Sequence, residues 1–344
     1  MIRIGIICPS EIAYRRFLPA LQKAGNNFKF SAIAIATPLE WFGDLNKVSP
    51  EDIEEQQAHE QAKAQAFIDK YGGQVIIGYA NLVTSDVIDA VYIPLPPALH
   101  YMWAKKALEA GKHVFVEKPS TINLTDTDEL IQIANDKSLV LHENYMFIFH
   151  NQLNDLNDVI KSGEIGDIRL YRISFGFPLR QLNDFRYNKK LGGGALLDAG
   201  GYCIKYARYL LGDTAKVAFA QTNGIEGFEV DMYGSATIIN EKGDVAQIAF
   251  GMDNDYRCDI EIWGSKGTIT SNRILTAPVG FTPFYTIKKN QHMEIRKLSE
   301  DDAFLKSIKQ FQVCLSSEKM RKENYRLLHE QEVLLKQFKD LSKH

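Results

Sequence analysis

Within residues 1–145, short apolar runs alternate with segments of helical spacing, and this alternation limits the fold more than any other feature of the sequence. Runs such as Ile2–Cys8 are continuously apolar, which is typical of strands buried on both faces of a sheet. Short links join strand to helix to strand, so neighbouring strands should pair in parallel. The pattern predicts an α/β Rossmann domain with a doubly wound parallel sheet. The predicted strands are Ile2–Cys8, Phe28–Thr37, Asp89–Leu95, His113–Glu117 and Leu139–Glu143.

The pattern changes near residue 146. From Ile168 onward, strands follow one another with few intervening helices, which is typical of a largely antiparallel sheet. A helix opened by glycines is expected over Gly192–Leu211, and two more helices at about Asp301–Ser316 and Lys322–Lys343. We therefore expect an α+β domain with a large, mostly antiparallel open sheet over residues 146–344. Its predicted strands are Ile168–Phe177, Val217–Asn223, Met232–Ile239, Ala246–Met252 and Cys258–Trp263.

Charge and composition exclude several classes of function. The 40 basic and 43 acidic residues leave a net charge of −3, which is too balanced for a protein that binds nucleic acid or an anionic membrane. No apolar stretch approaches ~18 residues and the start does not resemble a signal peptide, so no membrane association is expected. The four cysteines lie far apart, which favours free thiols and the cytoplasm. Without a Cys/His cluster or a His-Glu-x-x-His pattern, we predict no metal.

The turn after the first strand contains no glycine, although this is where a dinucleotide fold binds pyrophosphate. A helix N-terminus there supplies free N–H groups, and glycines normally let the backbone approach the phosphates. Here Cys8, Ser10, Glu11 and Ile12 stand in that turn. Cys8 and Ser10 are small, and Ser10 could hydrogen-bond a phosphate. The turn alone leaves two interpretations open, a modified cofactor site and a domain that has lost its cofactor.

The end of the second strand bears on the choice of cofactor. An acid there binds the ribose 2′-hydroxyl of NAD, whereas hydroxyl or basic groups admit the 2′-phosphate of NADP. The sequence has Thr37 and no acid before Glu40, which favours NADP(H) over NAD(H). Arg15 and Arg16 follow the first turn and could add positive charge, or could simply be solvated surface residues.

Three segments in this order and spacing resemble the Gfo/Idh/MocA oxidoreductase family. Asp89–Pro119 ends in the motif Glu-Lys-Pro, and His142–Gln152 follows. Gly192–Gly212 contains an Asp-x-Gly-x-Tyr pattern. A narrower likeness, carried by Phe175–Pro178 and Phe185–Asp198, is to NADPH-dependent nucleotide-sugar 3-ketoreductases. Those enzymes make deoxysugars and also have a modified first turn, which weakens the lost-cofactor interpretation.

The resemblance places Lys118 and Tyr202 at the family's catalytic positions. Reducing a ketone adds a hydride to carbon and a proton to oxygen, and a nearby ammonium lowers the pKa of a phenol that gives up its proton. Our hypothesis is that Tyr202 donates the proton and Lys118 is its electrostatic partner. A packed aromatic residue and a solvated lysine are the alternatives. Asp198, four residues before Tyr202, could orient a substrate hydroxyl or stabilise the helix N-terminus.

The resemblance also implies further contacts. Glu117 should lie on the nicotinamide side or brace its turn, and the X-Pro bond at Pro119 is expected to be cis. Arg186 could recognise a sugar or diphosphate, with a surface salt bridge as the alternative. Gly192–Gly194 would allow close approach to a ligand, or form a flexible turn. The remaining expected contacts are Leu95 and His100 for the cofactor, with helix capping as the alternative for His100, and Asn144 and Phe147 for the substrate.

These observations favour an NAD(P)-dependent oxidoreductase that reduces the keto group of a sugar or nucleotide-linked sugar. Two other functions fit the sequence less well. One is a dehydrogenase of a free sugar or trans-dihydrodiol, and the other is a cofactor-binding regulator without turnover. By analogy with relatives, we expect a homodimer or homotetramer that associates through the sheet of the C-terminal domain.

Overall fold

The structure, a computed structural model, describes residues 1–342 and divides into two compact units. Unit 1 comprises Met1–Thr121, Thr125–Asn144 and Ser307–Arg326, so a segment late in the sequence returns to the first unit. Unit 2 comprises Ile122–Leu124, Tyr145–Lys306 and the chain from Leu327 onward. The predicted last residues of the final helix (Lys343) and of the second domain (His344) lie outside the described residues.

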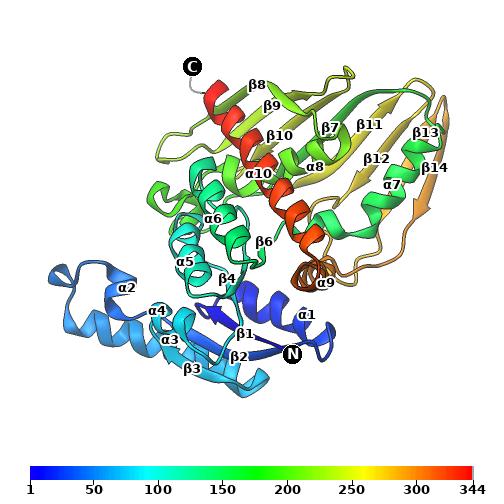
Figure 1. The fold of residues 1–344 in the computed structure, drawn as a ribbon. Coiled ribbons are helices and arrows are strands. Elements are labelled where there is room, and N and C mark those ends of the chain that lie inside the picture. The colour runs from blue at the N-terminus through cyan, green and yellow to red at the C-terminus, as the bar shows by residue number, and fades with distance from the viewer. Residues whose placement is uncertain (343–344) are drawn as a thin grey trace. The chain divides into compact units, whose positions relative to one another are not determined.

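Unit 1 is built on a six-stranded sheet with the order β3-β2-β1-β4-β5-β6, and every pairing is parallel (Figure 1). This confirms the predicted doubly wound Rossmann sheet. The direction of winding reverses between β1 and β4, and ligands of such sheets bind at the carboxyl ends of the strands flanking that point. The strand bounds are β1 Ile2–Ile7, β2 Phe28–Ile35, β3 Gln74–Ile77, β4 Ala90–Ile93, β5 His113–Val116 and β6 Leu141–Glu143.

Helices connect these strands, as the short links required. The sequence missed β3, whose four residues lie between Gly73 and Gly78 and give little periodic signal. The helix after β1 opens with a π-helical turn, η1 (Ala13–Phe17). The other helices are α1 Leu18–Lys23, α2 Pro38–Phe42, α3 Pro50–Tyr71, α4 Tyr79–Thr84, α5 Pro97–Glu109, α6 Leu124–Asp136 and α9 Ala303–Ser316.

Unit 2 contains an eight-stranded sheet with the order β14-β13-β12-β11-β7-β10-β9-β8. Only the β7–β10 pair is parallel, which confirms the mostly antiparallel sheet. The sequence missed the last three strands, which are short and only partly apolar. The strand bounds are β7 Ile168–Gly176, β8 Lys216–Asn223, β9 Tyr233–Ile239, β10 Val245–Gly251, β11 Arg257–Gly264, β12 Thr268–Asn272, β13 Phe284–Lys289 and β14 His292–Lys297.

The core of unit 2 lies between one face of this sheet and the helices α8 (Gly201–Leu211) and α10 (Glu318–Leu341), as Figure 1 shows. Inward side chains of β7, β10 and β11 alternate with exposed ones, so no helix within residues 1–342 covers the other face of the sheet. The remaining helix of unit 2 is α7 (Asn151–Lys161).

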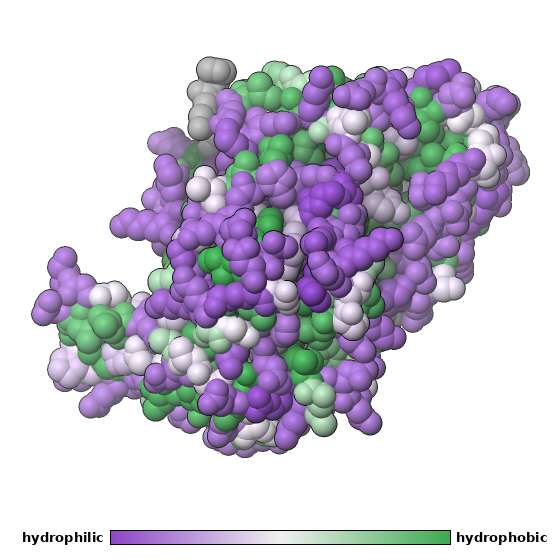
Figure 2. All heavy atoms as spheres, viewed as in Figure 1, coloured by the Kyte–Doolittle hydropathy of each residue, from purple (hydrophilic) through white to green (hydrophobic). Residues whose placement is uncertain are grey.

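The face of the molecule drawn in Figure 2 carries mainly hydrophilic side chains, with apolar ones scattered among them. Over residues 1–342, no helix is both long and apolar enough to cross a membrane. All four cysteines are free thiols. Among the described side chains, no group of three or more His, Cys, Asp or Glu residues is arranged to hold a metal ion.

Candidate active site

The turn after β1 keeps a left-handed backbone without glycine. Cys8 has a φ of 73°, a conformation that usually favours glycine. Its amide donates to the carbonyl of Ala34 at 3.1 Å, which anchors the turn to β2. Ser10 Oγ accepts the amide of Ala13 at 3.3 Å and so caps the helix that follows. The turn therefore combines a left-handed residue with a helix N-terminus directly after it, despite having no glycine.

The side chains of this turn differ in what they offer a ligand. Burial, with a smaller contribution from Glu60, raises the pKa of Cys8 to about 12, so its thiol stays neutral at physiological pH. Glu11 is exposed and pairs with Arg15 at 2.9 Å. Ile12 is half-buried at the start of the helix. The backbone of the turn and the Ser10 hydroxyl, rather than a charged side chain, are its groups suited to phosphate.

At the end of β2, Thr37 and Glu40 form a closed hydrogen-bonded pair. The Glu40 carboxylate accepts from the Thr37 amide at 2.8 Å and from the Thr37 hydroxyl at 3.2 Å. It also accepts from the amides of Tyr79 and Ala80, both at 3.0 Å. Burial opposes ionisation, but these hydrogen bonds lower the pKa of Glu40 below its ordinary value. The Thr37 hydroxyl thus donates to Glu40 here, and its role toward a 2′-phosphate stays a prediction.

The turn after β5 carries Glu117 and Lys118, and the bond from Lys118 to Pro119 is cis, as the resemblance implied. The buried Glu117 carboxylate accepts from Tyr92 Oη at 2.6 Å and from Asn144 Nδ2 at 2.7 Å. One residue beyond the proline, the amide of Ser120 donates to Glu143 Oε1 at 2.9 Å. Lys118 therefore stands on a turn that buried side chains hold on both sides.

His100 braces the same turn. Its Nδ1 lies 2.7 Å from the carbonyl oxygen of Pro119, and its Nε2 lies 2.6 Å from that of Leu95. Burial lowers the pKa of His100 to about 4, while both carbonyl oxygens act in the opposite direction. A neutral imidazole has one N–H, so His100 donates to one of these carbonyl oxygens while its other nitrogen lies beside the second, between the end of β4 and the Glu-Lys-Pro turn. Direct contact of these nitrogens with a cofactor, and helix capping, do not fit this geometry.

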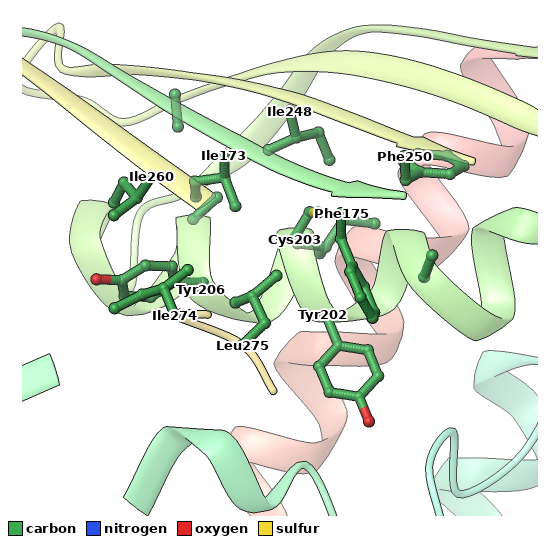
Figure 3. Packing of buried hydrophobic residues seen from close by; sticks show 14 of the residues in the cluster. Ile173, Phe175, Tyr202, Cys203, Tyr206, Ile248, Phe250, Ile260, Ile274 and Leu275 are labelled. Carbon is green, nitrogen blue, oxygen red and sulfur yellow. The ribbon is translucent and has the colours of Figure 1, made fainter. Parts of the chain in front are cut away.

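In unit 2, Tyr202 lies on α8 just after a second π-helical turn, η6 (Leu196–Gly200). Its ring packs edge-on against Tyr145 and Phe175, with centroids 5.1 and 5.2 Å away, and 5.5 Å from Phe147. In Figure 3 its hydroxyl points away from the labelled hydrophobic residues. Aromatic packing thus fixes the ring while the hydroxyl stays at the edge of the cluster. Phe147, expected to contact substrate, is only 2% exposed and supports Tyr202 instead.

Arg186 is held between two acids. Its guanidinium contacts Asp198 Oδ2 at 2.7 Å and Asp184 Oδ1 at 3.1 Å, with 20% of the side chain exposed. Arg186 therefore forms a salt bridge, but a largely buried one rather than the surface pair expected as the alternative, and its contact with a sugar or diphosphate stays a prediction. Gly193 fits its own chain rather than a ligand, since a Cβ there would lie 2.3 Å from the Arg186 carbonyl oxygen. Asp198 is thereby fixed at the start of the helix that carries Tyr202.

Sequence reasoning did not name three residues that lie beside the Glu-Lys-Pro turn, and it expected a different partner for Asn144. Tyr92, Glu143 and Ser307 all hold the Glu-Lys-Pro turn or its neighbours. Asn144, expected to contact substrate, is 2% exposed and hydrogen-bonds to Glu117. Position 144 follows β6 directly, so its proximity to the end of β5 could be inferred from parallel pairing. Nothing in the sequence pointed to Ser307.

Comparisons with known proteins cover nearly the whole chain. Residues 2–145 match a model described as an oxidoreductase family with an NAD-binding Rossmann fold, and residues 153–270 match the GFO/IDH/MocA C-terminal domain. The chain is 36% identical to dTDP-3,4-didehydro-2,6-dideoxy-alpha-D-glucose 3-reductase of Actinomadura kijaniata over 93% of its length and 90% of that protein. It is 34% identical to the reductase of the same name from Saccharopolyspora spinosa, over 90% of its length and 86% of that protein.

A solved structure extends the likeness to three dimensions. The 3-ketoreductase KijD10 from Actinomadura kijaniata, crystallised with NADP and TDP-benzene, superposes with a TM-score of 0.86 at 34% identity, covering 99% of this chain and 98% of that one. Both domain models and these relatives agree with the fold and the motifs described above. The chain is therefore an NAD(P)-binding oxidoreductase and belongs to the Gfo/Idh/MocA family.

Proposed function

We propose that this enzyme reduces the keto group of a nucleotide-linked sugar with NADPH. The observation that carries the proposal is the Glu117–Lys118–Pro119 turn, fixed by buried hydrogen bonds at the carboxyl end of β5. The named activity of the relatives from Actinomadura and Saccharopolyspora supports the substrate class. The left-handed turn at Cys8, with a helix N-terminus beyond it, fits a dinucleotide pyrophosphate.

When bound, the nicotinamide supplies the hydride that attacks the carbonyl carbon. We propose that Tyr202 gives its phenolic proton to the carbonyl oxygen, and that the Lys118 ammonium stabilises the resulting phenolate. The ring packing of Tyr202 supports this role, because a fixed ring needs no reorganisation to present its hydroxyl. Asp198, held by Arg186, would keep the start of that helix in place and leave Tyr202 as the proton donor.

The preference for NADPH over NADH is part of the same proposal. It draws support from KijD10, which was crystallised with NADP. Thr37 adds no support, because its hydroxyl donates to Glu40. Fluorescence titration with NADPH and NADH tests it directly: tighter binding of NADPH is expected, and equal or weaker binding would reject the preference. A chain that binds a nucleotide but turns over no sugar would instead favour the cofactor-binding regulator.

Replacing Tyr202 by Phe tests the proton donor. Loss of general-acid catalysis lowers rates by about 10²–10⁴-fold, so we expect NADPH binding to persist while reduction of keto-sugar nucleotides falls by that order. Tyr206→Phe is a matched control on the same helix, because the buried Tyr206 hydroxyl has no hydrogen-bond partner among the described residues. Near-normal turnover by Tyr202→Phe, with the control also unchanged, would reject the role.

A second candidate activity is oxidation of a free sugar. It is favoured by 30% identity, over 78% of this chain and 75% of that protein, to D-xylose 1-dehydrogenase (NADP(+)) 2 of Haloferax volcanii. The same Lys118 and Tyr202 would act in reverse. Reduction of NADP⁺ by free sugars, with no activity on keto-sugar nucleotides, would favour this candidate over the first.

Association through the uncovered sheet face of unit 2 and residence in the cytoplasm complete the proposal. The sheet face carries Phe219, Tyr233 and Trp263, which are 56%, 42% and 52% exposed. Exposed apolar groups on one face favour association. Light scattering should report a dimer or tetramer, and Trp263→Lys should shift it toward the monomer. A wild-type monomer at micromolar concentration would reject this part. The four free thiols agree with a reducing compartment.

A further inference from the structure

A buried chain of hydrogen bonds leads from α9 to the Glu-Lys-Pro turn, all of it within unit 1. Asn144 Nδ2 donates to Glu117 Oε1 at 2.7 Å, and Ser307 Oγ donates to Asn144 Oδ1 at 2.8 Å. His142 Nε2 lies 2.9 Å from Ser307 Oγ. The four side chains are between 0% and 9% exposed. The Glu-Lys-Pro motif ends at Pro119, so Ser307 and His142 lie outside it.

The direction of every bond in this chain follows from one end. Asn144 Nδ2 donates to Glu117 and Asn144 Oδ1 accepts from Ser307, which is the orientation that an ionised Glu117 carboxylate requires, because it can only accept. Ser307 has a single hydroxyl hydrogen, which goes to that oxygen. Ser307 must then accept from His142, so His142 carries a proton on Nε2. Each group thereby fixes the orientation of the next.

Ser307 is the group that settles which way the Asn144 amide faces. Without its hydroxyl, nothing in this chain of bonds would hold Asn144 Oδ1 away from Glu117. A rotated amide would set two acceptor oxygens against each other in a buried site, which is costly. Asn144 is the last residue of unit 1 before the long segment Tyr145–Lys306 of unit 2, and Ser307 is the first residue of unit 1 after that segment. The bond between them therefore holds the two ends of unit 1 that flank this segment beside the Glu117 carboxylate.

We propose that Ser307 is a positioning residue for the Glu117–Lys118 turn, acting through Asn144 to keep an amide donor on the Glu117 carboxylate. Its importance for turnover rests on the proposed role of Lys118. The titratable groups facing Glu117 are Tyr92 from β4 and Lys118 from its own turn, with His142 reached through Ser307. Burial raises the pKa of Glu117, while Tyr92, Asn144 and Lys118 act in the opposite direction.

The test measures the ionisation of Glu117. Infrared difference spectroscopy monitors it on the whole protein, without added nucleotide or sugar. Its carboxylic-acid band is assigned by its loss in Glu117→Gln. In Ser307→Ala we expect the band to appear at a pH about one unit higher, a tenfold change in the ionisation constant. Ser271→Ala is the matched control, because Ser271 is 2% exposed and its hydroxyl donates to the Phe284 carbonyl at 2.8 Å. It should leave the band unchanged.

Two results would overturn the proposal. One is a Glu117 band at the same pH in Ser307→Ala as in the wild type. The other is a shift of the Glu117 band by Ser307→Ala in the Asn144→Ala background that equals its shift in the wild-type background. A residue that acts through Asn144 has no further effect once the Asn144 side chain is gone. Neither result depends on turnover. A wild-type chain that reduces no keto-sugar nucleotide would reject the proposed function, whereas an unmoved band rejects this inference.

Discussion

The Glu40 carboxylate accepts hydrogen bonds from two helix N-termini, and its removal should destabilise both of them. Its carboxylate accepts the amide of Thr37 at the start of α2 and the amides of Tyr79 and Ala80 at the start of α4. Loss of one helix cap costs about 1 kcal/mol, so Glu40→Ala should destabilise this part of unit 1 by about 2 kcal/mol at neutral pH. Because about 1.36 kcal/mol corresponds to a factor of ten, a loss of about 2 kcal/mol should make local opening of these two helix starts about thirtyfold more frequent.

The pH dependence gives a second, independent signature. The folded-state pKa of Glu40 lies below the ordinary value of 4.5, so its contribution to stability is complete above that value and is lost as the pH falls through the folded pKa. The difference between wild type and Glu40→Ala should therefore be full at neutral pH and shrink in acid. Glu40→Gln keeps one acceptor oxygen, so it should lose less stability and lack this pH dependence.

Hydrogen exchange of peptides spanning α2 and α4, with urea unfolding followed by circular dichroism, measures both effects. The exposed Glu54 on α3 provides the control, since Glu54→Ala removes a carboxylate of the same kind from a surface position. Exchange in Glu40→Ala that matches the control would refute the capping argument. A difference from wild type that grows in acid would refute the electrostatic part.

Three further substitutions test the turns around the site, each by thermal unfolding. Cys8→Val should destabilise by about 2 kcal/mol, because a β-branched residue tolerates the φ of 73° poorly, whereas Cys8→Gly should unfold near the wild-type temperature; equal stability of both would contradict the strained turn. Arg186→Met should cost about 3 kcal/mol by removing the guanidinium that pairs with Asp184 and Asp198, and a milder loss in Asp184→Ala than in Arg186→Met is expected. Gly193→Ala should cost about 2 kcal/mol, because its Cβ would lie 2.3 Å from a backbone oxygen, and an unshifted melting curve would show that the turn adjusts freely.

The sequence could predict the parallel sheet because its signals are local. Continuous apolar runs, helix caps and short links each operate over a few residues, and five of the six strands of unit 1 fall within the predicted ranges. The sequence did not predict β3 and β12–β14. These strands are short and partly polar, and their pairing depends on neighbouring strands rather than on a hydrophobic pattern of their own. The motif residues Lys118 and Tyr202 could be named from resemblance to a family, although their roles remain proposals.

By itself, the sequence determined the alternation of strands and helices in the first domain, the mostly antiparallel sheet of the second and the presence of the Glu-Lys-Pro motif. Only the tertiary structure decided that the turn after β1 keeps a left-handed residue without glycine, and that His100 and Asn144 brace a turn from within. It also brought Ser307 to Asn144 across 163 positions of the chain. The physical reason is that backbone preferences act between neighbours in sequence, whereas a buried polar group must find its partner wherever packing places one.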